Sequence, residues 1–515
     1  MLENYTKYFN EIDVETDDSV SPTEMRPLIQ QIQTAHTPES LVEQLHGESG
    51  IILLRSGFFD SPQARYSFVT ARPLLSFRSF GSRCEIRFAD DSQPSTPNPQ
   101  LQFGNPWHIL DSLMARYELL EEIDSPFPLG GCFGYFGYDL KNFVEPKLPR
   151  AAVNDLELPD CAVGFYDSLV VFDHRLEKTW IISTGLQSDG SRSEKLANDQ
   201  FEFWRSRLSR ELQQTLIPLA LGKGEGRGEV VFSNLSRTEF LSKVEQAQRY
   251  IRAGDIYQVN LSQRLAAKCA VSDWDFFLRL SSVSPAPFSA YLDCGDFQIA
   301  SSSPESFLRM SGSQIQTRPI KGTRPRSSDS NRDAQLTYEL QTSAKEMAEL
   351  VMITDLLRND LGKVCEYGSV QVPELVRLER YPQVQHLVST IEGRLRNDVT
   401  HFAAFASSFP GGSITGAPKI RAMEIIDELE PITRGPYTGA LGYLGFNRES
   451  QLSIAIRTAV YKEDKIYFHV GAGIVADSNP ESEYEETLAK ARGFVAAIQE
   501  SYHVLSETLD TGLCR

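Results

Sequence analysis

The chain has 515 residues, of which 41% are hydrophobic and 23% charged, an ordinary globular composition that excludes a disordered, collagenous or coiled-coil protein. Lys and Arg number 51 against 69 Asp and Glu, for a formal net charge of −18. A field of that sign argues against nucleic acid or an anionic membrane as the main partner, so an anionic substrate would need a local cationic pocket.

The cysteines and the first residues indicate the compartment. Seven cysteines are scattered without a C-x-x-C pair, which is typical of a reduced chain and not of a disulfide framework. Residues 1–18 are acidic and lack an apolar run of signal-peptide length. No stretch approaches the roughly 18 apolar residues of a membrane span. We expect a cytoplasmic protein.

The first half alternates short strands with a few helices. A glycine-dense run at 128–140 predicts close backbone packing, a better reading than a phosphate loop because the G-x-G-x-x-G context is missing. Residues 90–105 are rich in Pro, Ser and Asn and predict a loop. The β-rich runs predict strands, and two polar-apolar stretches predict helices; the strands are 51–57, 66–71, 74–80, 84–88, 164–174 and 179–184, and the helices 107–119 and 193–213.

The main boundary is predicted at residues 218–229, where the composition shifts to Gly and charge. It divides the chain into an N-terminal region (1–225), a catalytic domain (226–505) and a tail (506–515). After it, Phe240, Val244, Ala247 and Ile251 mark an amphipathic helix that Gly254 ends. Strands then alternate with long helices, so α+β with largely antiparallel sheets is favoured over a doubly wound fold.

Two later helices carry carboxylates at matched spacing. In 342–362, Ser343 and Glu346 form a capping-box pattern that assigns Glu346 to the cap, and Glu349 lies at the edge of the apolar face. In the second helix, which Asn479 caps with Pro480 as its first residue, Glu483 and Glu486 share a face and Lys490 follows Glu486 at i+4. Spacing alone favours a solvated acidic face over a binding site.

Three short segments point to chemistry. Residues 409–418 are rich in glycine and precede a helix, whose exposed amides would form an anion site, although such loops often only turn the chain. A second glycine cluster, 470–474, precedes the carboxylate helix. Lys321, in RPIKGTRPR, would be a nucleophile if it were held unprotonated in a partly desolvated site. Composition alone favours an exposed surface lysine there.

Nine ordered motifs resolve these weak signals by resemblance. They are IYQVNLSQR, SSSPESFLR, RPIKGTRPR, SAKEMAELVMITDLLRNDLG, QHLVSTIEG, FPGGSITGAPKIRAMEIIDELEP, RGPYTGALGYLGF, SIAIRT and GAGIVADSNPESEYEETLAKA. Together they resemble the chorismate-utilising enzymes, which include anthranilate synthase component I, aminodeoxychorismate synthase component I, and the isochorismate and salicylate synthases. The resemblance covers about residues 235–500 and more loosely the first half. It implies an anthranilate synthase component I-like fold of two intertwined halves.

Two positions indicate the subfamily. Gln258 stands where the members that add water carry a lysine, which argues against isochorismate or salicylate synthesis. Lys321 stands where anthranilate synthases carry alanine, and PGGSITGAPK is similar to the aminodeoxychorismate synthases of para-aminobenzoate and folate synthesis. The resemblance therefore implies conversion of chorismate and ammonia to 4-amino-4-deoxychorismate. The alternatives are an anthranilate synthase and an inactive paralogue that only binds a glutaminase.

The same resemblance implies a role for each site residue. Glu349 and Glu486 would hold Mg²⁺ with Glu483 beside it, and Lys490 would contact the ring carboxylate. Arg457, Tyr437, Gly471 and Gly473 would bind the enolpyruvyl carboxylate. Lys321 would attack the ring, Glu305 would act as general acid and then base, and His386 and Thr323 would position the leaving group.

Two partners follow from the resemblance. A separate glutaminase subunit would supply ammonia, because no cysteine of the chain has a nucleophile-elbow setting. An amino-acid pocket between the halves would take tryptophan, either as an inhibitor or as a structural element. Plain inter-sheet packing is an equally good reading of the residues that match this pocket, which are Arg65, Tyr66, Ser67, Phe68, Pro287, Phe288 and Ser289.

Overall fold

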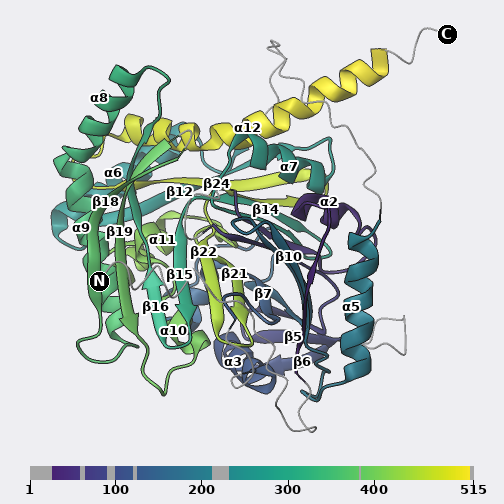
Figure 1. Ribbon diagram of the computed structural model, residues 1–515. Coiled ribbons are helices and arrows are strands. Elements are labelled where there is room, and N and C mark those ends of the chain that lie inside the picture. Colours follow the sequence, from purple (N-terminus) through teal and green to yellow (C-terminus); the bar gives the residue numbers. More distant parts are fainter. Residues whose placement is uncertain are drawn as a thin grey trace.

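A computed structural model of the chain describes residues 26–57, 64–89, 99–119, 125–210, 231–381 and 384–510. Its described part consists of two large β-sheets with helices around them (Figure 1). Every pair of named strands in these sheets is antiparallel, and each sheet holds twelve strands. The α+β class with antiparallel sheets is confirmed.

The first sheet has the order β1 (Leu28–Ile32), β10 (Lys178–Ser183), β9 (Ser168–Asp173), β3 (Tyr66–Thr70), β2 (Ile52–Arg55), β13 (Phe288–Asp293), β14 (Gln298–Ser303), β23 (Thr458–Lys462), β24 (Lys465–Ile474), β12 (Gln258–Lys268) and β11 (Phe232–Ser233), and β20 (Gly416–Ala417) pairs with β12. The second has the order β17 (Ile320–Pro325), β19 (Val384–Arg394), β16 (Gln314–Thr317), β15 (Ser306–Ser311), β22 (Glu449–Ile454), β21 (Ala440–Gly445), β7 (Gly131–Phe136), β8 (Cys161–Tyr166), β4 (Leu75–Phe80), β5 (Arg83–Phe88) and β6 (Gln100–Phe103), and β18 (Gln371–Arg380) pairs with β19.

The two halves of the chain are joined within both sheets. In the first sheet β2 pairs with β13, and in the second β7 pairs with β21. Strands from before and after the predicted boundary therefore share one hydrogen-bond ladder, which confirms that the halves are intertwined. The boundary segment 218–229 lies outside the described residues, so its position stays a prediction.

Helices surround the sheets. In Figure 1, α8 and α9 flank β18 and β19, α5 stands beside β1 and β10, and α12 runs along one edge over β24 and α7. The helices are α2 (Pro38–Glu43), α3 (Pro106–Tyr117), α4 (Lys141–Val144), α5 (Glu194–Leu208), α6 (Arg237–Ala253), α7 (Asp273–Val283), α8 (Ser330–Gln341), α9 (Ala344–Gly362), α10 (His401–Ser408), α11 (Lys419–Leu429) and α12 (Pro480–Asp510), with short 3-10 turns η1 (Tyr138–Leu140) and η2 (Gly412–Ile414).

Local sequence signals explain several helix ends. Ser236 and Glu239 form a capping box at the start of α6, and Gly254 ends it with a left-handed φ of 83°, a conformation that favours glycine. The Asn479 side chain accepts a hydrogen bond from the Ser482 amide, 3.1 Å away, at the start of α12. These predicted boundaries are confirmed.

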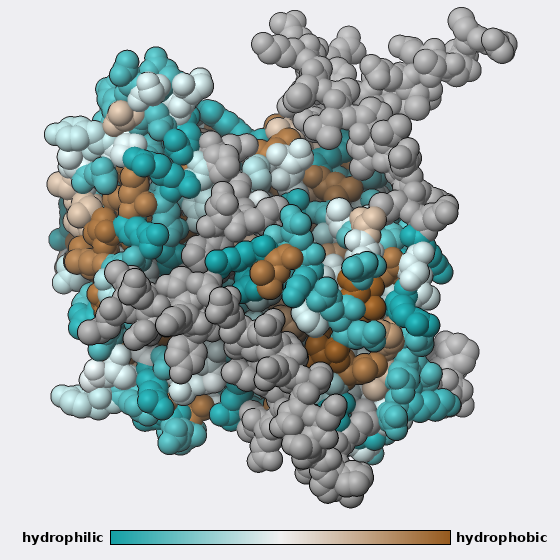
Figure 2. Space-filling view, viewed as in Figure 1, coloured by the Kyte–Doolittle hydropathy of each residue, from teal (hydrophilic) through white to brown (hydrophobic). Residues whose placement is uncertain are grey.

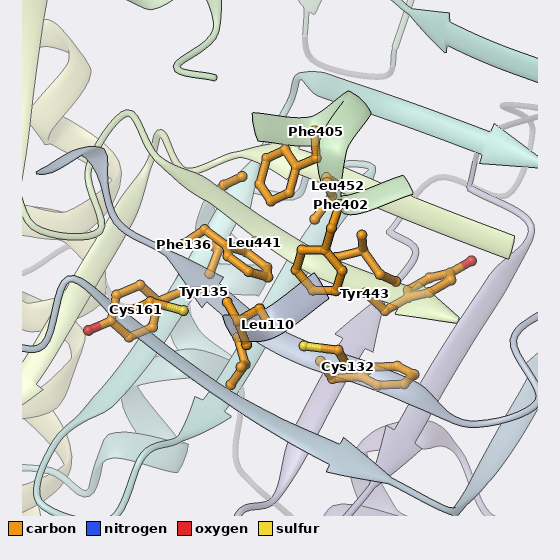
Figure 3. Close-up of a cluster of buried hydrophobic side chains, with 14 of the residues drawn as sticks. Leu110, Cys132, Tyr135, Phe136, Cys161, Phe402, Phe405, Leu441, Tyr443 and Leu452 are labelled. Atoms are coloured by element: carbon orange, nitrogen blue, oxygen red, sulfur yellow. The ribbon is translucent and has the colours of Figure 1, made fainter. Parts of the chain in front are cut away.

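The main core lies where the halves meet (Figure 3). Phe136 of β7 packs edge-on against Phe405 of α10, with 4.9 Å between ring centroids. The glycine run allows this density, because a Cβ atom at Gly134 would lie 2.3 Å from the Ala162 carbonyl oxygen. The prediction of close backbone packing at 128–140 is confirmed.

The structure corrects one local prediction. Within the predicted loop 90–105, residues Gln100–Phe103 form strand β6, which pairs with β5 and thereby extends the edge of the second sheet. Its four residues are all exposed, so the run lacks the apolar alternation by which a half-buried strand is detected. Residues 90–98 of that loop lie outside the described residues.

The surface is mixed. On the face shown in Figure 2, apolar side chains form separate small groups among hydrophilic ones, and one group lies over α9 and β18, where Val351 and Leu375 are exposed. Within the described ranges, no helix has the length and apolarity needed to cross a bilayer. The six cysteines described there are free thiols.

Candidate active site

A cavity of about 730 Å³ lies between strands of both sheets and the helices α9 and α12, within the size range of small-molecule sites. Every residue predicted as catalytic, substrate-binding or metal-binding lines this one cavity. These residues are Glu305, Lys321, Thr323, Glu349, His386, Tyr437, Arg457, Gly471, Gly473, Glu483, Glu486 and Lys490. The structure thus brings them together from segments that span almost two hundred residues, and their individual roles stay predictions.

Lys321 reaches the cavity from an irregular strand. The pairing of β17 with β19 shifts register between Lys321 and Thr323, and Gly322 has a left-handed φ of 65°. Five successive residues of β17, from Ile320 to Arg324, line the cavity, whereas a regular strand would turn alternate residues to the other face. The Lys321 Nζ atom lies 3.9 Å from Glu349 Oε2, and each side chain is 16% exposed. The reading of Lys321 as an exposed surface lysine is wrong.

Glu305 is a buried acid beside Lys321. It sits between β14 and β15 and is 6% exposed. Burial raises its pKa to about 6, although the Ser413 hydroxyl, the Lys321 charge and the Ile320 amide oppose the shift. A carboxyl with that pKa can hold or release a proton near neutral pH, as a general acid or base must.

His386 faces Thr323 across the β17–β19 pair, with 2.9 Å between its Nδ1 and the Thr323 Oγ1. Burial lowers the pKa of His386 to about 4, against an opposing hydrogen bond with the Gly322 backbone. The imidazole is therefore neutral at neutral pH and suits hydrogen bonding more than charge pairing.

An acidic cluster lines the cavity where α9 and α12 approach each other. Burial raises the pKa of Glu349 and of Glu483, and the Glu486 charge adds to both shifts. Glu486 itself is half exposed and pairs with Lys490 at 2.8 Å, while the Lys490 Nζ also donates to the Gly471 carbonyl oxygen at 2.8 Å. The predicted i, i+4 pair is present, and it faces the cavity.

The capping prediction for Glu346 is wrong in its second half. Ser343 Oγ does accept from the Glu346 amide, 3.4 Å away. The Glu346 side chain, however, pairs with Arg324 at 3.3 Å and lines the cavity. The Arg324 cation of strand β17 competes successfully with the local cap of α9, because a charge-assisted contact is stronger than a neutral one. Glu346 thus adds a fourth carboxylate to the cluster.

The acidic cluster suits a hard cation. In the described part of the chain, no three His, Cys, Asp or Glu side chains converge as a ready-made metal cage. Mg²⁺ does not need one, since it usually keeps several waters and takes one or two carboxylates together with a substrate oxygen. Four carboxylates on one wall, two of them with burial-raised pKa values, fit that requirement. Mg²⁺ remains a proposal.

Another part of the cavity wall contains a desolvated cation, Arg457. Burial lowers the pKa of Arg457, and only the nearby Tyr437 acts against the shift. No carboxylate of the described residues pairs with its guanidinium. A buried charge without a partner is costly, and a ligand carboxylate would satisfy the Arg457 fork in the bidentate geometry that guanidinium favours.

Gly471 and Gly473 of β24 also line this part of the cavity. A Cβ atom at Gly471 would lie 2.7 Å from the Tyr437 hydroxyl, and one at Gly473 would lie 2.5 Å from Gln258 Nε2. Gln258 lines the cavity as well, and its Oε1 is buried without a hydrogen-bond partner. The backbone of Gly471 and Gly473 can therefore lie close to Tyr437 and Gln258, where the side chain of any other residue would clash.

Two further residues of the site were missed from the sequence. Ser413 lines the cavity and hydrogen-bonds Glu305; its place in the glycine-rich loop was the available signal. His469 lines the cavity and stacks on Tyr437, with 5.2 Å between centroids and 13° between planes. It shares a strand face with Gly471 and Gly473 at a period of two, a signal that could have found it.

The predicted anion site at the start of α11 does not form part of this cavity and stays a prediction. The loop contributes Ser413 and Ile414 to the cavity, but no residue of α11 lines it. Lys419, the first residue of α11, is instead buried against Asp360 and the Ser408 and Pro410 carbonyl oxygens. Those contacts anchor the helix to α9.

The predicted amino-acid pocket is a separate and much smaller cavity of about 40 Å³. Five of the seven residues predicted for it line this cavity, namely Tyr66, Phe68, Pro287, Phe288 and Ser289. Ser67 points elsewhere, to His174 Nε2 at 2.6 Å, and Arg65 pairs with Asp173. The space holds a few waters at most, so a tryptophan would have to displace side chains, and its binding stays a prediction.

Comparison with known proteins is consistent with this site. The model of the family described as "chorismate binding enzyme" matches residues 58–496. The chain is 39% identical to anthranilate synthase component 1 of Acetivibrio thermocellus, over 90% of this chain and 93% of that protein. It is also 39% identical to aminodeoxychorismate synthase component 1 of Escherichia coli, over 87% and 93%. The crystal structure of anthranilate synthase component I from Streptococcus pneumoniae superposes with a TM-score of 0.71 at 30% identity, covering 85% of this chain and 94% of that one.

Proposed function

The chain belongs to the family of chorismate-binding enzymes, and from that premise we propose that it converts chorismate and ammonia to 4-amino-4-deoxychorismate, the reaction of an aminodeoxychorismate synthase component 1. One observation carries the choice. Lys321 lies inside the cavity, 3.9 Å from Glu349, and its charge acts on the buried Glu305, where it partly opposes the burial that raises the pKa of that acid. An amine at that place is what a covalent route to amination needs.

Substrate binding uses the two walls of the cavity. Arg457, Tyr437 and the Gly471 and Gly473 amides would hold the enolpyruvyl carboxylate, because this wall has a positive charge without a partner. Lys490, which donates to the Gly471 carbonyl oxygen beside this wall, would contact the ring carboxylate. When bound by Glu349 and Glu486, with Glu483 beside them, Mg²⁺ would supply positive charge that draws electrons toward the ring carboxylate.

The amination would proceed in two balanced displacements. The unprotonated Lys321 amine bonds to ring C2, the two ring double bonds each shift by one position, and the C4–oxygen bond breaks. Glu305 donates its proton, so the C4 hydroxyl leaves as water. Ammonia then bonds to C4, the double bonds shift back, and the C2–nitrogen bond to Lys321 breaks. Glu305 takes the excess proton from the new amine.

The remaining residues would hold this geometry. The neutral His386 and Thr323 would hydrogen-bond the departing hydroxyl and give it no competing charge. Ser413 would keep Glu305 oriented, since it bonds the carboxyl directly. The enolpyruvyl group is untouched in this route, and a separate lyase would have to remove it.

The proposal includes a glutaminase partner as the source of ammonia. Burial raises the pKa of every described cysteine for which a shift is resolved, namely Cys84, Cys132, Cys161, Cys294 and Cys365. A raised thiol pKa disfavours the thiolate that attacks glutamine. These cysteines therefore suit packing, and glutamine hydrolysis falls to another subunit.

Product identity tests the proposal. The purified chain would be incubated with chorismate, Mg²⁺ and ammonium, and the products identified by mass and by anthranilate fluorescence. We expect 4-amino-4-deoxychorismate as the main product. Anthranilate as the main product would replace the proposal with the anthranilate synthase reaction, which the equally similar relative makes the strongest alternative. The absence of any turnover would favour an inactive glutaminase-binding paralogue.

A further inference from the structure

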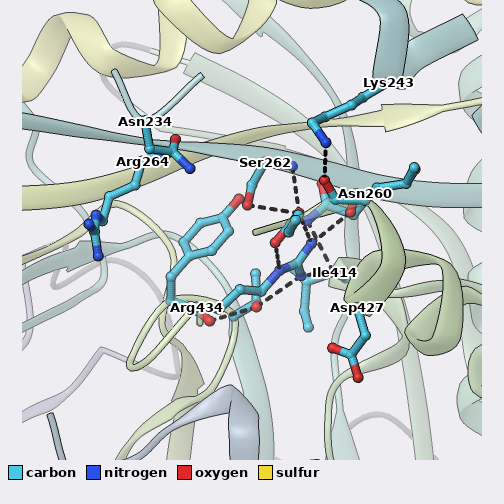
Figure 4. Close-up of polar contacts among 12 residues, drawn as sticks. Asn234, Lys243, Asn260, Ser262, Arg264, Ile414, Asp427 and Arg434 are labelled. Carbon is cyan, nitrogen blue, oxygen red and sulfur yellow. Dashed lines mark hydrogen bonds and ion pairs between the residues drawn. The ribbon is translucent and has the colours of Figure 1, made fainter. Parts of the chain in front are cut away.

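Behind the Tyr437 wall lies a second buried arginine, Arg434, which does not line the cavity. Its guanidinium is fully engaged (Figure 4). Nε and Nη2 donate to the two Glu430 carboxylate oxygens at 2.8 and 2.7 Å, and Nη2 also donates to the Asn260 carbonyl oxygen at 2.7 Å. Nη1 donates to the Thr438 hydroxyl at 3.1 Å and to the Ile414 carbonyl oxygen at 3.4 Å.

These contacts join three segments that are far apart in the sequence. Asn260 belongs to β12, Ile414 to the glycine-rich turn η2, and Thr438 follows Tyr437 directly. Asn260, Ile414 and Tyr437 all line the cavity. The Arg434 guanidinium also lies 5.7 Å from the Tyr437 ring centroid. One planar fork thus fixes the relative positions of three parts of the cavity wall.

Glu430 connects the Arg434 contacts to β12, the strand that pairs with the two glycines of β24. Its Oε1 accepts from the Ser262 amide at 2.8 Å and from the Ser262 hydroxyl at 3.0 Å. Ser262 pairs with Gly471 in the β12–β24 ladder, as Asn260 pairs with Gly473. The ion pair is therefore connected through β12 to both glycines that line the cavity.

We propose that Arg434, paired with Glu430, is a positioning residue that sets the wall formed by Tyr437, Gly471 and Gly473 for the substrate carboxylate. The inference rests on the proposed function only in taking the cavity to bind chorismate. A lysine could keep the charge opposite Glu430, but it lacks the planar fork that reaches Asn260, Thr438 and Ile414 at once. The geometry of the guanidinium, and not its charge alone, is the property at issue.

The test is Arg434→Lys, assayed by chorismate loss with saturating ammonium and Mg²⁺. The wall binds the carboxylate that does not react, so its misplacement weakens ground state and transition state alike. We expect the KM for chorismate to rise about tenfold or more while kcat changes by less than about threefold. Because chorismate loss is followed whichever amine forms, and product identity is determined separately, failure of this inference is distinguishable from failure of the proposed reaction.

A matched control separates positioning from loss of stability. Lys141 of α4 and Asp427 of α11 form another buried ion pair, at 3.0 Å, and neither residue lines the cavity. Asp427→Asn should lower the melting temperature without changing the KM for chorismate. An Arg434→Lys protein with a lowered melting temperature and a KM within twofold of the wild type would show a purely structural role and overturn the inference.

A milder variant decides the case if Arg434→Lys does not fold. Thr438→Val keeps the branched shape and removes only the hydroxyl that accepts from Arg434 and donates to the Tyr437 carbonyl oxygen. Thr438 is buried and does not line the cavity. We expect its KM for chorismate to rise about threefold with kcat preserved. An unchanged KM in a folded Thr438→Val protein would also overturn the inference.

Discussion

Arg434 and Arg457 are two cations near Tyr437, and their surroundings differ in one respect. Burial lowers the pKa of both side chains, but at Arg434 the charge and hydrogen bonds of Glu430 outweigh it and raise the pKa overall. At Arg457 only Tyr437 opposes burial, and the pKa falls. The first arginine is satisfied within the protein, whereas the second is left for a ligand to satisfy.

The same contrast holds for whole regions. Behind the cavity wall, buried charges are paired, as in Lys141 with Asp427 and Lys419 with Asp360. Inside the cavity the pairing is looser at two cations, because Lys321 meets Glu349 only at 3.9 Å and no carboxylate of the described residues pairs with Arg457. Incompletely compensated charge therefore marks the functional region, and substitutions in the two regions should have opposite effects on activity and stability.

The largest effect is expected for Lys321→Ala. If the amine is the nucleophile, its loss removes a covalent step, and formation of aminodeoxychorismate should fall by about three orders of magnitude or more. The unfolding free energy should change little, because no close ion pair is broken. Product formation by mass and chemical denaturation would measure the two quantities.

Lys345→Ala is the matched control for that variant. Lys345 lines the same cavity, and its charge also acts on the Glu349 pKa, yet it lies on α9 and not on the strand beside Glu305. Its loss should reduce the rate by less than about tenfold. Equal losses in the two lysine variants would mean that Lys321 supplies only charge.

Arg457→Gln tests the comparison of the two arginines directly. Gln carries the same backbone conformation, φ 52°, and removes the guanidinium. We expect kcat/KM for chorismate to fall about a hundredfold, with no loss of unfolding free energy because no buried carboxylate is left unpaired. Arg434→Gln should instead destabilise the fold by about 3–5 kcal/mol, since it leaves Glu430 buried and unpaired. Similar stability losses in both variants would break the comparison.

The Glu305 pKa predicts a pH dependence of stability. Burial raises this pKa from 4.5 to about 6, so between those values the folded protein keeps a proton that the unfolded chain has lost. The associated stability is present below pH 4.5 and is lost as the pH rises through about 6, by about 2 kcal/mol. Glu305→Gln mimics the protonated acid, so we expect it to match the wild type at pH 4.5 and to exceed its unfolding free energy at pH 7. A difference that does not vary with pH would contradict the assignment.

Sequence patterns could predict the site because its residues lie in compact motifs. Lys321, Glu349 and Glu486 each stand in a segment whose resemblance is specific, and the cavity unites them. The patterns misjudged Glu346 of helix α9, because a local capping signal cannot reveal that Arg324 of strand β17 competes for its side chain. They also passed over Arg434, whose partners from β12 and η2 are distant in the chain. Local rules fail where long-range contacts decide.

Predictions from local sequence patterns failed for the same reason at one strand of the fold. Strand β6 has four exposed residues and no apolar alternation, so only its pairing with β5 reveals it. The helix α6, in contrast, carries its capping box and its terminal glycine within its own sequence. A helix such as α6, whose ends are set by its own capping residues, can be predicted from the sequence. A strand such as β6, which forms only because it pairs with an adjacent strand, cannot.

The smallest effect is expected for Glu349→Gln. The Gln side chain keeps the size of Glu349 and removes one of the carboxylates available to Mg²⁺, while Glu486 and Glu483 remain. The Mg²⁺ concentration for half-maximal activity should therefore rise about tenfold, with activity partly recovered at high Mg²⁺. Glu346→Gln is the control on the same helix, because Arg324 already engages that carboxylate, and its Mg²⁺ titration should move less. If the titration of Glu349→Gln coincided with that of the wild type, the acidic cluster would serve only to orient Lys321, and the cavity would contain no metal ligand at Glu349.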